Sequence, residues 1–251
     1  MEDDSSVLQE RIGEAAEIIR RRGPALVLTG AGISIDSGIP PFRGPGGLWE
    51  RYDPEEYGHI EVLKRDPEKA WIMLRDMLTT ILKARPNEAH YALAELERAG
   101  FISYVVTQNV DGLHEMAGSR RVLNFHGGGR YLYCMKCSSR RELESVEDID
   151  PIKCTCGGYF RPPYVFFGEP IPHEVLSRSF IEATRADVIL VIGTSAGVYP
   201  AAQLPYEVKR HGGVVVEVNP SPTPLTGTIT DIFIQSGSSD ALVKLKEYLL
   251  G

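Results

Sequence analysis

The chain has 251 residues, of which 43% are apolar and 24% charged, a composition typical of a globular protein with a substantial core. Its formal net charge of −7, from 27 basic and 34 acidic residues, argues against general nucleic-acid binding through a basic face. No apolar stretch reaches membrane-spanning length, and residues 1–4 (MEDD) lack the basic-then-apolar layout of a signal peptide. We therefore expect a cytoplasmic protein with no membrane partner.

The first part of the chain predicts a helix, a buried strand and a glycine turn. A capping-box pattern at 6–9 begins a helix that Gly23-Pro24 ends, and the apolar run 25–29 is typical of a buried strand. Gly30-Ala31-Gly32 follows, where glycines let the backbone approach a phosphate with its N–H groups free to bind the anion. An ordinary strand-to-helix turn remains an alternative at this point.

The residues after this turn depart from the usual dinucleotide fingerprint. A third glycine normally opens a helix where this chain has Ile35. Pro40 and Pro41 then prevent a long regular helix. We expect a pyrophosphate turn followed by a loop that can cover the ligand.

The middle of the chain alternates helices and strands with two interruptions. Residues 44–60, rich in Gly, Pro and Tyr, predict irregular structure. Helices are expected from Asp66-Pro67 to Pro86 and from Asn87 to Gly100, and strands at 102–107 and 122–126.

All four cysteines lie in the second interruption, residues 130–160, as Cys134-x-x-Cys137 and Cys154-x-Cys156. Two pairs at such spacing suit tetrahedral thiolate ligation of one zinc ion. Two disulfides are the alternative, which a reducing compartment disfavours. Four thiolates leave no position for water or substrate, so the predicted zinc is structural.

The alternation resumes in the last third of the chain, with helices at 173–185, 201–211 and 239–250 and strands at 187–192, 214–218 and 231–235. Apolar strands alternating with helices predict an α/β fold, a Rossmann-like doubly wound parallel sheet covered on both faces. We assign residues 1–43, 86–129 and 161–251 to this domain. Residues 44–85 and 130–160 are two insertions expected to form a smaller helical and zinc-binding domain.

Residues that could bind a ligand or take part in catalysis follow five of the predicted strands. Gly30, Gln108, His126, Gly193 and Asn219 come directly after strands, and ligands of open α/β sheets bind beyond the carboxyl ends of strands. We therefore expect these five positions to meet in one crevice.

The segment 107–114 places several polar side chains directly after a buried strand, which is costly unless they have partners. Asn109 and Asp111 suit a carboxamide, because one can donate and the other accept. Either could instead cap a short helix, which explains one of these side chains but not all. His126 is a candidate general base at the same edge, and a core histidine without chemistry is the alternative.

Together these motifs resemble the sirtuins, the NAD-dependent protein-lysine deacylases, over about residues 20–245. The matching pieces follow the family's order: Gly-Ala-Gly-Ile-Ser (30–34), Ser-Gly-Ile-Pro (37–40), Phe-Arg-Gly (42–44), Thr-Gln-Asn-Val-Asp-Gly-Leu-His (107–114), His-Gly (126–127), the four cysteines, Phe-Phe-Gly-Glu (166–169), Gly-Thr-Ser (193–195) and Val-Asn-Pro (218–220).

The resemblance implies that NAD is consumed as a substrate. The acyl oxygen of a modified lysine would attack the ribose carbon that carries nicotinamide, and His126 would deprotonate a ribose hydroxyl so that the acyl group is captured. Water then releases lysine and an O-acyl-ADP-ribose. The implied partners are acylated-lysine proteins or peptides, without sequence-specific nucleic-acid binding.

The resemblance also assigns site residues. His126 and Asn109 would be catalytic. Cofactor contacts are expected at Gly30, Ala31, Gly32, Ile33, Ser34, Phe42, Arg43, Trp49, Gln108, Asn109, Val110, Asp111, Gly193, Thr194, Ser195, Asn219, Pro220, Ser221 and Ser238. The peptide would add as a strand through backbone hydrogen bonds, with contacts at Val165, Phe166, Phe167, Gly168, Glu169 and Val198.

The chain departs from the family pattern at a few positions. Pro41 stands where many sirtuins have Asp, and Phe125 replaces a common Leu. Some sirtuins carry Tyr-x-x-Arg on the helix after the cofactor loop, which binds succinyl or malonyl carboxylates; Leu74 and Met77 align there. We expect weak desuccinylation and a preference for acetyl or longer apolar acyl groups, although core packing explains these side chains equally well.

Other functions stay open at this stage. They are mono-ADP-ribosyl transfer to a protein and a sensor that binds NAD or O-acyl-ADP-ribose without turnover. A zinc-ribbon nucleic-acid module is disfavoured by the acidic charge. An ordinary dehydrogenase is disfavoured by the absent third glycine and by a closed zinc site.

Overall fold

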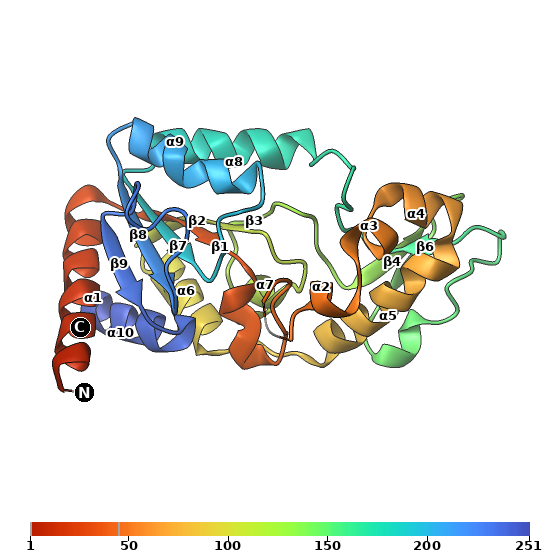
Figure 1. Cartoon of the computed structure of the whole chain (residues 1–251), viewed down its shortest axis with the longest axis horizontal. Coiled ribbons are helices and arrows are strands. Elements are labelled where there is room, and N and C mark those ends of the chain that lie inside the picture. The colour runs from red at the N-terminus through yellow and green to blue at the C-terminus, as the bar shows by residue number, and fades with distance from the viewer. Residues whose placement is uncertain (1, 45) are drawn as a thin grey trace.

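The computed structural model describes residues 2–44 and 46–251, so Met1 and Pro45 of the predicted ranges lie outside it. Six parallel strands form the main sheet in the order β3-β2-β1-β7-β8-β9 (Figure 1). Counted along the chain within this sheet, the order is 3-2-1-4-5-6, that of doubly wound dinucleotide-binding folds. The predicted fold class is confirmed.

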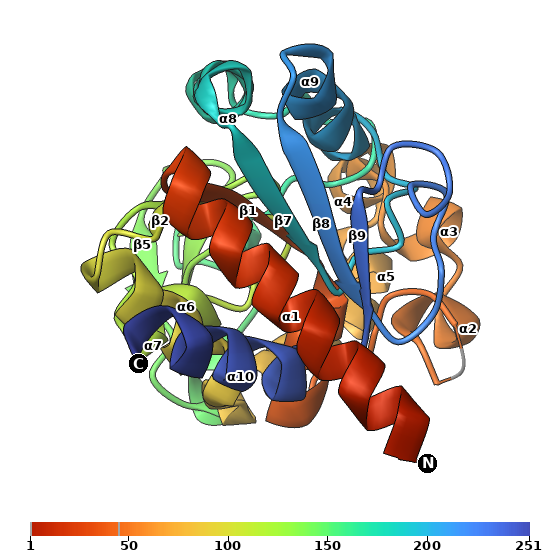
Figure 2. The same cartoon turned by 90° about the vertical axis from the view of Figure 1, so that its left-hand side faces the viewer.

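Helices cover both faces of this sheet. Its strands are β1 (Ala25–Thr29), β2 (Ile102–Thr107), β3 (Val122–Asn124), β7 (Val188–Ile192), β8 (Val214–Asn219) and β9 (Ile232–Gln235). One face carries α1 (Glu2–Arg22), α6 (Glu88–Arg98) and α10 (Ser238–Leu250), which Figure 2 shows in front of the strands. The other face carries α8 (His173–Arg185) and α9 (Leu204–Arg210), with the short η3 (Ala201–Gln203) between them in sequence.

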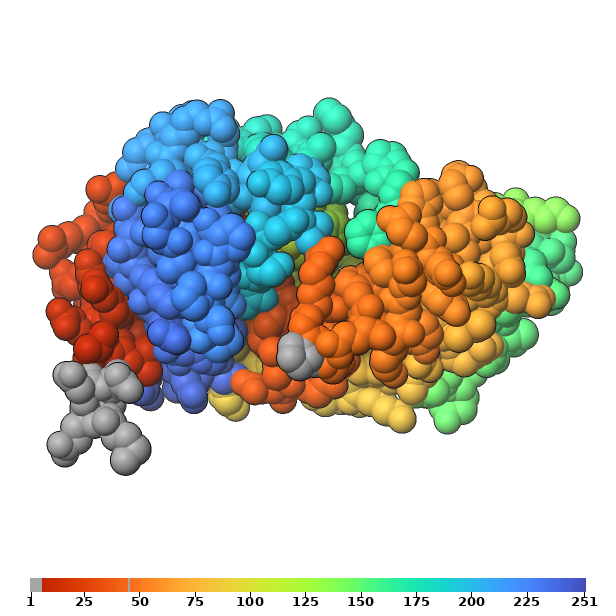
Figure 3. Space-filling view, viewed as in Figure 1, coloured from red at the N-terminus to blue at the C-terminus, as the bar shows by residue number. Residues whose placement is uncertain are grey.

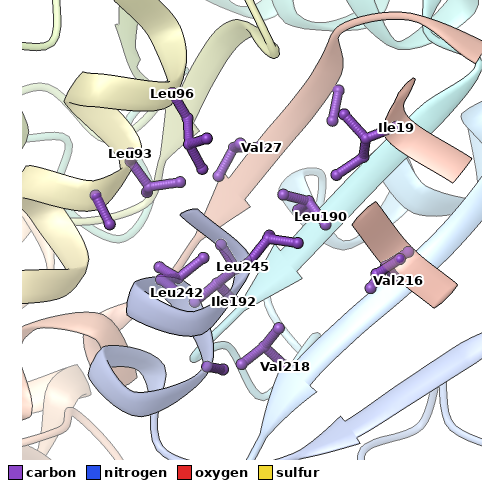
Figure 4. Packing of buried hydrophobic residues seen from close by; sticks show 14 of the residues in the cluster. Ile19, Val27, Leu93, Leu96, Leu190, Ile192, Val216, Val218, Leu242 and Leu245 are labelled. Carbon is purple, nitrogen blue, oxygen red and sulfur yellow. The ribbon is translucent and has the colours of Figure 1, made fainter. Parts of the chain in front are cut away.

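Successive strand residues point to opposite faces, so the central strands must be apolar throughout. Val27 of β1 packs with Leu93 and Leu242 in the core under α6 and α10 (Figure 4). Its neighbour Leu26 packs in the core on the other face, with Val208 of α9. This two-sided burial explains the uninterrupted apolar runs in the sequence.

A second set of elements has its own core. It consists of α2 (Leu48–Arg51), α3 (Pro54–Tyr57), α4 (Ile60–Arg65) and α5 (Pro67–Lys83), with η2 (Val146–Ile149) and an antiparallel sheet of β5 (Arg140–Glu142), β4 (Tyr131–Cys134) and β6 (Phe160–Arg161). The Trp71 Nε1–H donates to the Phe160 carbonyl oxygen at 2.8 Å and so joins the two insertions. The domain boundaries stay a prediction: the separate core supports two insertions that pack together, but β6 spans the boundary predicted between 160 and 161, and Tyr164 and Phe166 also pack into this core.

The expectation of irregular structure over 44–60 is wrong. Two short helices, α2 and α3, lie there, and α4 begins at its end. Asp53 caps α3 by accepting from the Glu55 N–H, next to Pro54 in the first turn. His59 caps α4 in the same way through Nδ1. The Gly and Pro content of the segment concealed these local start signals.

Smaller differences concern element ends. The residues after the glycine turn form a 3-10 helix, η1 (Ala31–Ser37), before the expected loop. The strand predicted at 122–126 ends at Asn124, and the helix predicted at 201–211 is divided into η3 and α9. A short helix, α7 (Leu113–Ala117), follows the polar segment. Within the described residues, no helix combines the length and apolar character needed to cross a bilayer.

Candidate active site

A cavity of about 790 Å³ lies at the carboxyl ends of the main strands, where the two parts of the molecule meet. Figure 3 shows the cyan to blue residues of the large part beside the orange residues of the small part. All five positions predicted to converge line this cavity: Gly30, Gln108, His126, Gly193 and Asn219. The predicted crevice is therefore present.

The glycine turn packs backbone against backbone. The Gly30 N–H donates to the Ile192 carbonyl at 3.1 Å and the Gly32 N–H to the Gly193 carbonyl at 2.8 Å. A Cβ atom on Gly32 would lie 2.6 Å from the Gly193 Cα, so glycine is required for this approach. The prediction that the N–H groups of this turn stay free for an anion is wrong for Gly30 and Gly32, because these two join the ends of β1 and β7.

His126 is held with one ring nitrogen fixed. Its Nδ1 lies 3.0 Å from the carbonyl oxygen of Gln108. A carbonyl can only accept, so Nδ1 carries the proton and Nε2 of the neutral ring is an acceptor. Burial lowers the pKa of His126 below 6.5, and the hydrogen bond to Gln108 opposes this shift in part. The ring is therefore neutral near pH 7 and able to take up a proton.

Asn109, Ser34 and Asp111 form a buried network behind the cavity wall. The Asn109 amide donates to the Gly30 carbonyl at 3.1 Å and to the Ser34 hydroxyl at 3.2 Å. The Ser34 hydroxyl donates to Asp111 at 2.8 Å, and burial raises the pKa of that carboxyl. Asn109 Oδ1 is buried and has no hydrogen-bond partner among the described residues. An N–H donor of a ligand would satisfy it.

A second set of contacts joins the ends of β2, β7 and β8. The Gln108 amide donates to the Thr194 hydroxyl at 2.9 Å. The Asn219 amide donates to the Thr194 carbonyl, also at 2.9 Å. Side chains from three strand ends thus hold one another in place along the cavity.

The structure brings most of the predicted ligand contacts together. The cavity is lined by Gly30, Ala31, Gly32, Phe42, Arg43, Trp49, Gln108, Asn109, Val110, Gly193, Thr194, Ser195, Asn219, Pro220, Ser221 and Ser238, and on the peptide side by Val165, Phe166, Phe167, Gly168, Glu169 and Val198. Ile33, Ser34 and Asp111 are buried and do not line it. Asp111 lines a smaller adjoining cavity of about 40 Å³.

Some lining residues were missed from the sequence. Tyr164, Ile171, Tyr199 and Thr223 also border the cavity. Tyr199 is 65% exposed beside Val198. Each lies within two residues of a predicted contact, so proximity to the recognised motifs was the available signal.

The four cysteines form one cluster, as the spacing predicts. Their Sγ atoms all lie within 4.8 Å of one another, with 3.5 Å between Cys134 and Cys156 and 3.8 Å between Cys137 and Cys154. Sulfurs about 2.3 Å from a tetrahedral zinc lie at such separations. The Cys156 backbone N–H, above all, lowers the pKa of Cys154 to about 6, whereas for Cys156 the hydrogen bond from the Gly158 N–H is outweighed by the neighbouring thiols and burial, which raise its pKa. This donor set fits one zinc ion.

Strand order, glycine turn and a cysteine-bearing second part define a Rossmann-type nucleotide-binding protein. Residues 30–200 match the Sir2 family, and the chain belongs to this family. It is 47% identical to an NAD-dependent protein deacylase of Archaeoglobus fulgidus, with 89% of this chain and 92% of that protein covered. A Thermococcus kodakarensis protein of the same description is also 47% identical, with 93% and 94% covered.

Solved structures agree. A Sir2 homologue in complex with NAD superposes with a TM-score of 0.86 at 45% identity, with 94% of this chain and 93% of that chain covered. A Sir2 complex with a p53 peptide and NAD has a TM-score of 0.83 at 35% identity, with 93% and 96% covered.

Proposed function

We propose that this protein is an NAD-dependent protein-lysine deacylase that releases nicotinamide, an O-acyl-ADP-ribose and free lysine. Relatives that match nearly all of the chain are described as NAD-dependent protein deacylases, which supports this activity. The observation that carries the proposal is the neutral, fixed imidazole of His126 in a cavity bounded by five strand ends.

NAD would lie along the carboxyl ends of the strands. Asn219, Pro220, Ser221 and Ser238 line the side assigned to adenosine, and Gly193, Thr194 and Ser195 the side assigned to phosphate and ribose. At the other end, the unpartnered Asn109 Oδ1 would accept an N–H of the nicotinamide carboxamide. Ser34 and Asp111 would hold Asn109 in this orientation rather than contact the ligand.

His126 would act as general base. NAD supplies a ribose carbon with nicotinamide as leaving group, and the acyl oxygen of lysine supplies the nucleophile. The free Nε2 of His126 would accept the proton of a ribose hydroxyl, while Gln108 keeps Nδ1–H in place. A neutral imidazole with a lowered pKa suits this role near pH 7.

The acylated lysine would enter beside segment 165–169, which lines the cavity. Met73, Leu74 and Met77 of α5 border the same cavity and bring only apolar side chains. An acyl carboxylate would find neither a hydroxyl nor a guanidinium on this helix face. We therefore propose acetyl and longer apolar acyl groups as preferred substrates.

Zinc would be structural. Cys134, Cys137, Cys154 and Cys156 would supply all four ligands, and the ion would cross-link β4 to the loop before β6. A Cβ on Gly158 would lie 2.7 Å from the Cys134 Sγ, so this glycine leaves room for the sulfur cluster.

Mass spectrometry of products from NAD and an acetyl-lysine peptide tests the proposal. Nicotinamide, O-acetyl-ADP-ribose and free lysine are expected, with no product when either substrate is omitted. Transfer of ADP-ribose to a protein would show a mono-ADP-ribosyltransferase instead. Binding of NAD without nicotinamide release would show a sensor.

A further inference from the structure

The segment between β6 and α8 makes a tight turn beside the cavity. The Glu169 N–H donates to the Phe166 carbonyl at 3.0 Å, and Gly168 between them has φ of +80°. Positive φ at the third residue of a β-turn suits glycine. Phe167 at the tip is 38% exposed and packs on Trp49, with ring centroids 5.7 Å apart. The turn thus presents an aromatic ring to the cavity, which Phe167 lines.

Arg161, at the end of β6, uses every nitrogen of its guanidinium to bind the segment that leads into and through this turn. Nη1 and Nη2 each donate to one carboxylate oxygen of Glu169 at 2.7 Å. Nη2 also donates to the Tyr164 carbonyl at 2.6 Å, and Nε to the Pro162 carbonyl at 3.3 Å. One side chain therefore binds both the start and the end of the segment.

The carboxylate of Glu169 is engaged inside the protein. Besides Arg161, it accepts the Phe166 N–H at 3.0 Å. Burial acts to raise the pKa of Glu169, but these hydrogen bonds outweigh it and leave the pKa below its usual value. The side chain predicted to contact the peptide thus stays ionised and stabilises its own turn.

The pair is largely withdrawn from solvent. The side chain of Arg161 is 8% exposed and that of Glu169 22%, and the guanidinium also lies 4.7 Å from the centre of the Phe166 ring. Bidentate arginine–carboxylate pairs fix geometry as well as charge. A lysine would keep the charge but lose the fork that binds two oxygens and two carbonyls at once.

The inner edge of the segment is fixed by backbone contacts. The Val165 N–H donates to the His126 carbonyl at 2.8 Å, and the Phe167 N–H to the Gly58 carbonyl at 3.1 Å. The Ile60 N–H returns a bond to the Phe167 carbonyl at 2.9 Å. In Figure 1 the chain leading into α8 passes beside α3, which ends just before Gly58. The Arg161–Glu169 pair fixes the same segment at its other end, residue 169.

We infer that Arg161 is a positioning residue for the acylated peptide: with Glu169 it fixes the 166–169 turn that the incoming strand contacts. This inference rests on the proposed function. Arg161 lies outside the cavity lining, so it acts through the turn rather than by touching the substrate. The residues assigned to NAD come from other segments, which makes a selective effect on peptide binding the expected signature.

The test compares Arg161→Lys and Glu169→Gln with Arg75→Lys. Arg75 forms a bidentate pair with Asp150 at 2.7 and 3.2 Å on an exposed surface of the same part, so it is a matched control. For each variant we would measure KM for an acetyl-lysine peptide, affinity for that labelled peptide by fluorescence anisotropy, affinity for NAD by calorimetry, and the melting temperature.

Arg161→Lys should raise the peptide KM and dissociation constant at least about tenfold, with NAD affinity within about twofold of wild type. Glu169→Gln should act in the same direction and more weakly, and Arg75→Lys should change neither constant. A folded Arg161→Lys protein with wild-type peptide affinity would overturn the inference. So would equal losses of peptide and NAD affinity in both site variants, which would indicate a general structural role.

The two proposals can fail separately. If the wild-type protein binds the peptide but releases no nicotinamide, the proposed function fails, and the peptide affinity of Arg161→Lys still decides the inference. If Arg161→Lys does not fold, Glu169→Gln decides it, because that variant keeps the size of the side chain while it removes the charge and replaces one oxygen that accepts from Arg161 with an NH2 donor.

Discussion

The two parts of the molecule are held together by different means. In the large part, β1 and β7 are buried along their whole length between helices on both faces, so hydrophobic burial carries the fold. In the small part, β4, β5 and β6 have four, three and two residues. There, the cysteines and the bidentate Arg75–Asp150 pair join the pieces, and Arg161 of β6 binds Glu169 in the segment that leads to α8. Small cores commonly need such cross-links.

This difference has a functional side. The end of the cavity proposed to bind the nucleotide is shaped by backbone packing between Gly32 and Gly193, which leaves little freedom. The end proposed to bind the peptide is shaped by a turn that polar side chains hold. We expect perturbations of the small part to reduce peptide turnover before nucleotide binding, and perturbations of the glycine turn to do the reverse.

Removal of zinc should give the largest effect. Structural zinc contributes about 10–16 kcal/mol to the folding of zinc-finger peptides, which is as large as the whole free energy of unfolding of most domains. Cys154→Ser, or chelation, should abolish peptide deacylation and unfold the small part, while the large part retains ADP-ribose binding. Circular dichroism and calorimetry with ADP-ribose measure both. Full peptide turnover by metal-free protein would contradict a structural role for the four cysteines.

His126→Ala tests the base directly. General acid–base catalysis contributes about 10²–10⁴-fold, so kcat should fall by that amount. NAD affinity should stay within a few-fold of wild type. The hydrogen bond of the ring goes through Nδ1 to the Gln108 carbonyl, and among the described residues the ring makes no hydrogen bond to the end of another strand. Formation of O-acetyl-ADP-ribose and free lysine measures the step that needs the base, because nicotinamide leaves before it, and calorimetry measures NAD affinity. Activity that survives in this variant would show that another group accepts the proton.

Gly32→Ala tests whether the glycine turn of the large part determines NAD affinity. Its Cβ would lie 2.6 Å from the Gly193 Cα and 2.7 Å from the Gly193 oxygen, and neither backbone atom can move freely. NAD affinity should fall about 10–100-fold, since such strain costs about 1–3 kcal/mol. Gly13→Ala on α1 is the control, with its nearest atom 3.8 Å away. Unchanged NAD affinity in Gly32→Ala would show that the close packing of Gly32 on Gly193 is not needed for NAD binding.

The pH profile should report the environment of His126. The base works in its neutral form, so kcat/KM falls as pH drops through the pKa of the free enzyme. Burial lowers that pKa, and the acid limb should therefore have its midpoint below 6.5. A steady-state profile from about pH 5 to about pH 8 measures it, with NAD affinity followed over the same range. A midpoint above 6.5 would mean that the ring is more hydrated or differently partnered.

The sequence predicts the large part better than the small one. Its central strands carry continuous apolar runs, and Gly30 and Gly193 directly follow two of them, so β1 was located to the residue and five strand ends were correctly placed in one cavity. In the small part, β5 and β6 are too short for periodicity to register. The helices α2 and α3 depend on single capping contacts such as that of Asp53.

The site shows the same division. Spacing alone indicated the cysteine cluster, and position after a strand indicated His126. Which side chains face the ligand and which stand behind them depends on packing, so Ser34 and Asp111 were expected as contacts but lie behind the wall. Arg161 was missed because its bonds reach residues 162, 164 and 169, a pattern without fixed spacing.

The smallest effect is expected for the preference among acyl groups. This preference depends on the side chains that the small part contributes to the cavity. Met73, Leu74 and Met77 reach the cavity from α5, so the small part would supply an apolar wall for the acyl group. Acetyl and longer apolar acyl peptides should be processed faster than succinyl peptides, because a carboxylate desolvated against this wall has no partner. Introducing Leu74→Tyr with Met77→Arg should raise succinyl turnover and lower acetyl turnover, a reversal of about tenfold in their kcat/KM ratio. Wild-type protein with succinyl peptide as its best substrate would show that another cationic group of the cavity, such as Arg43, reads the acyl chain instead.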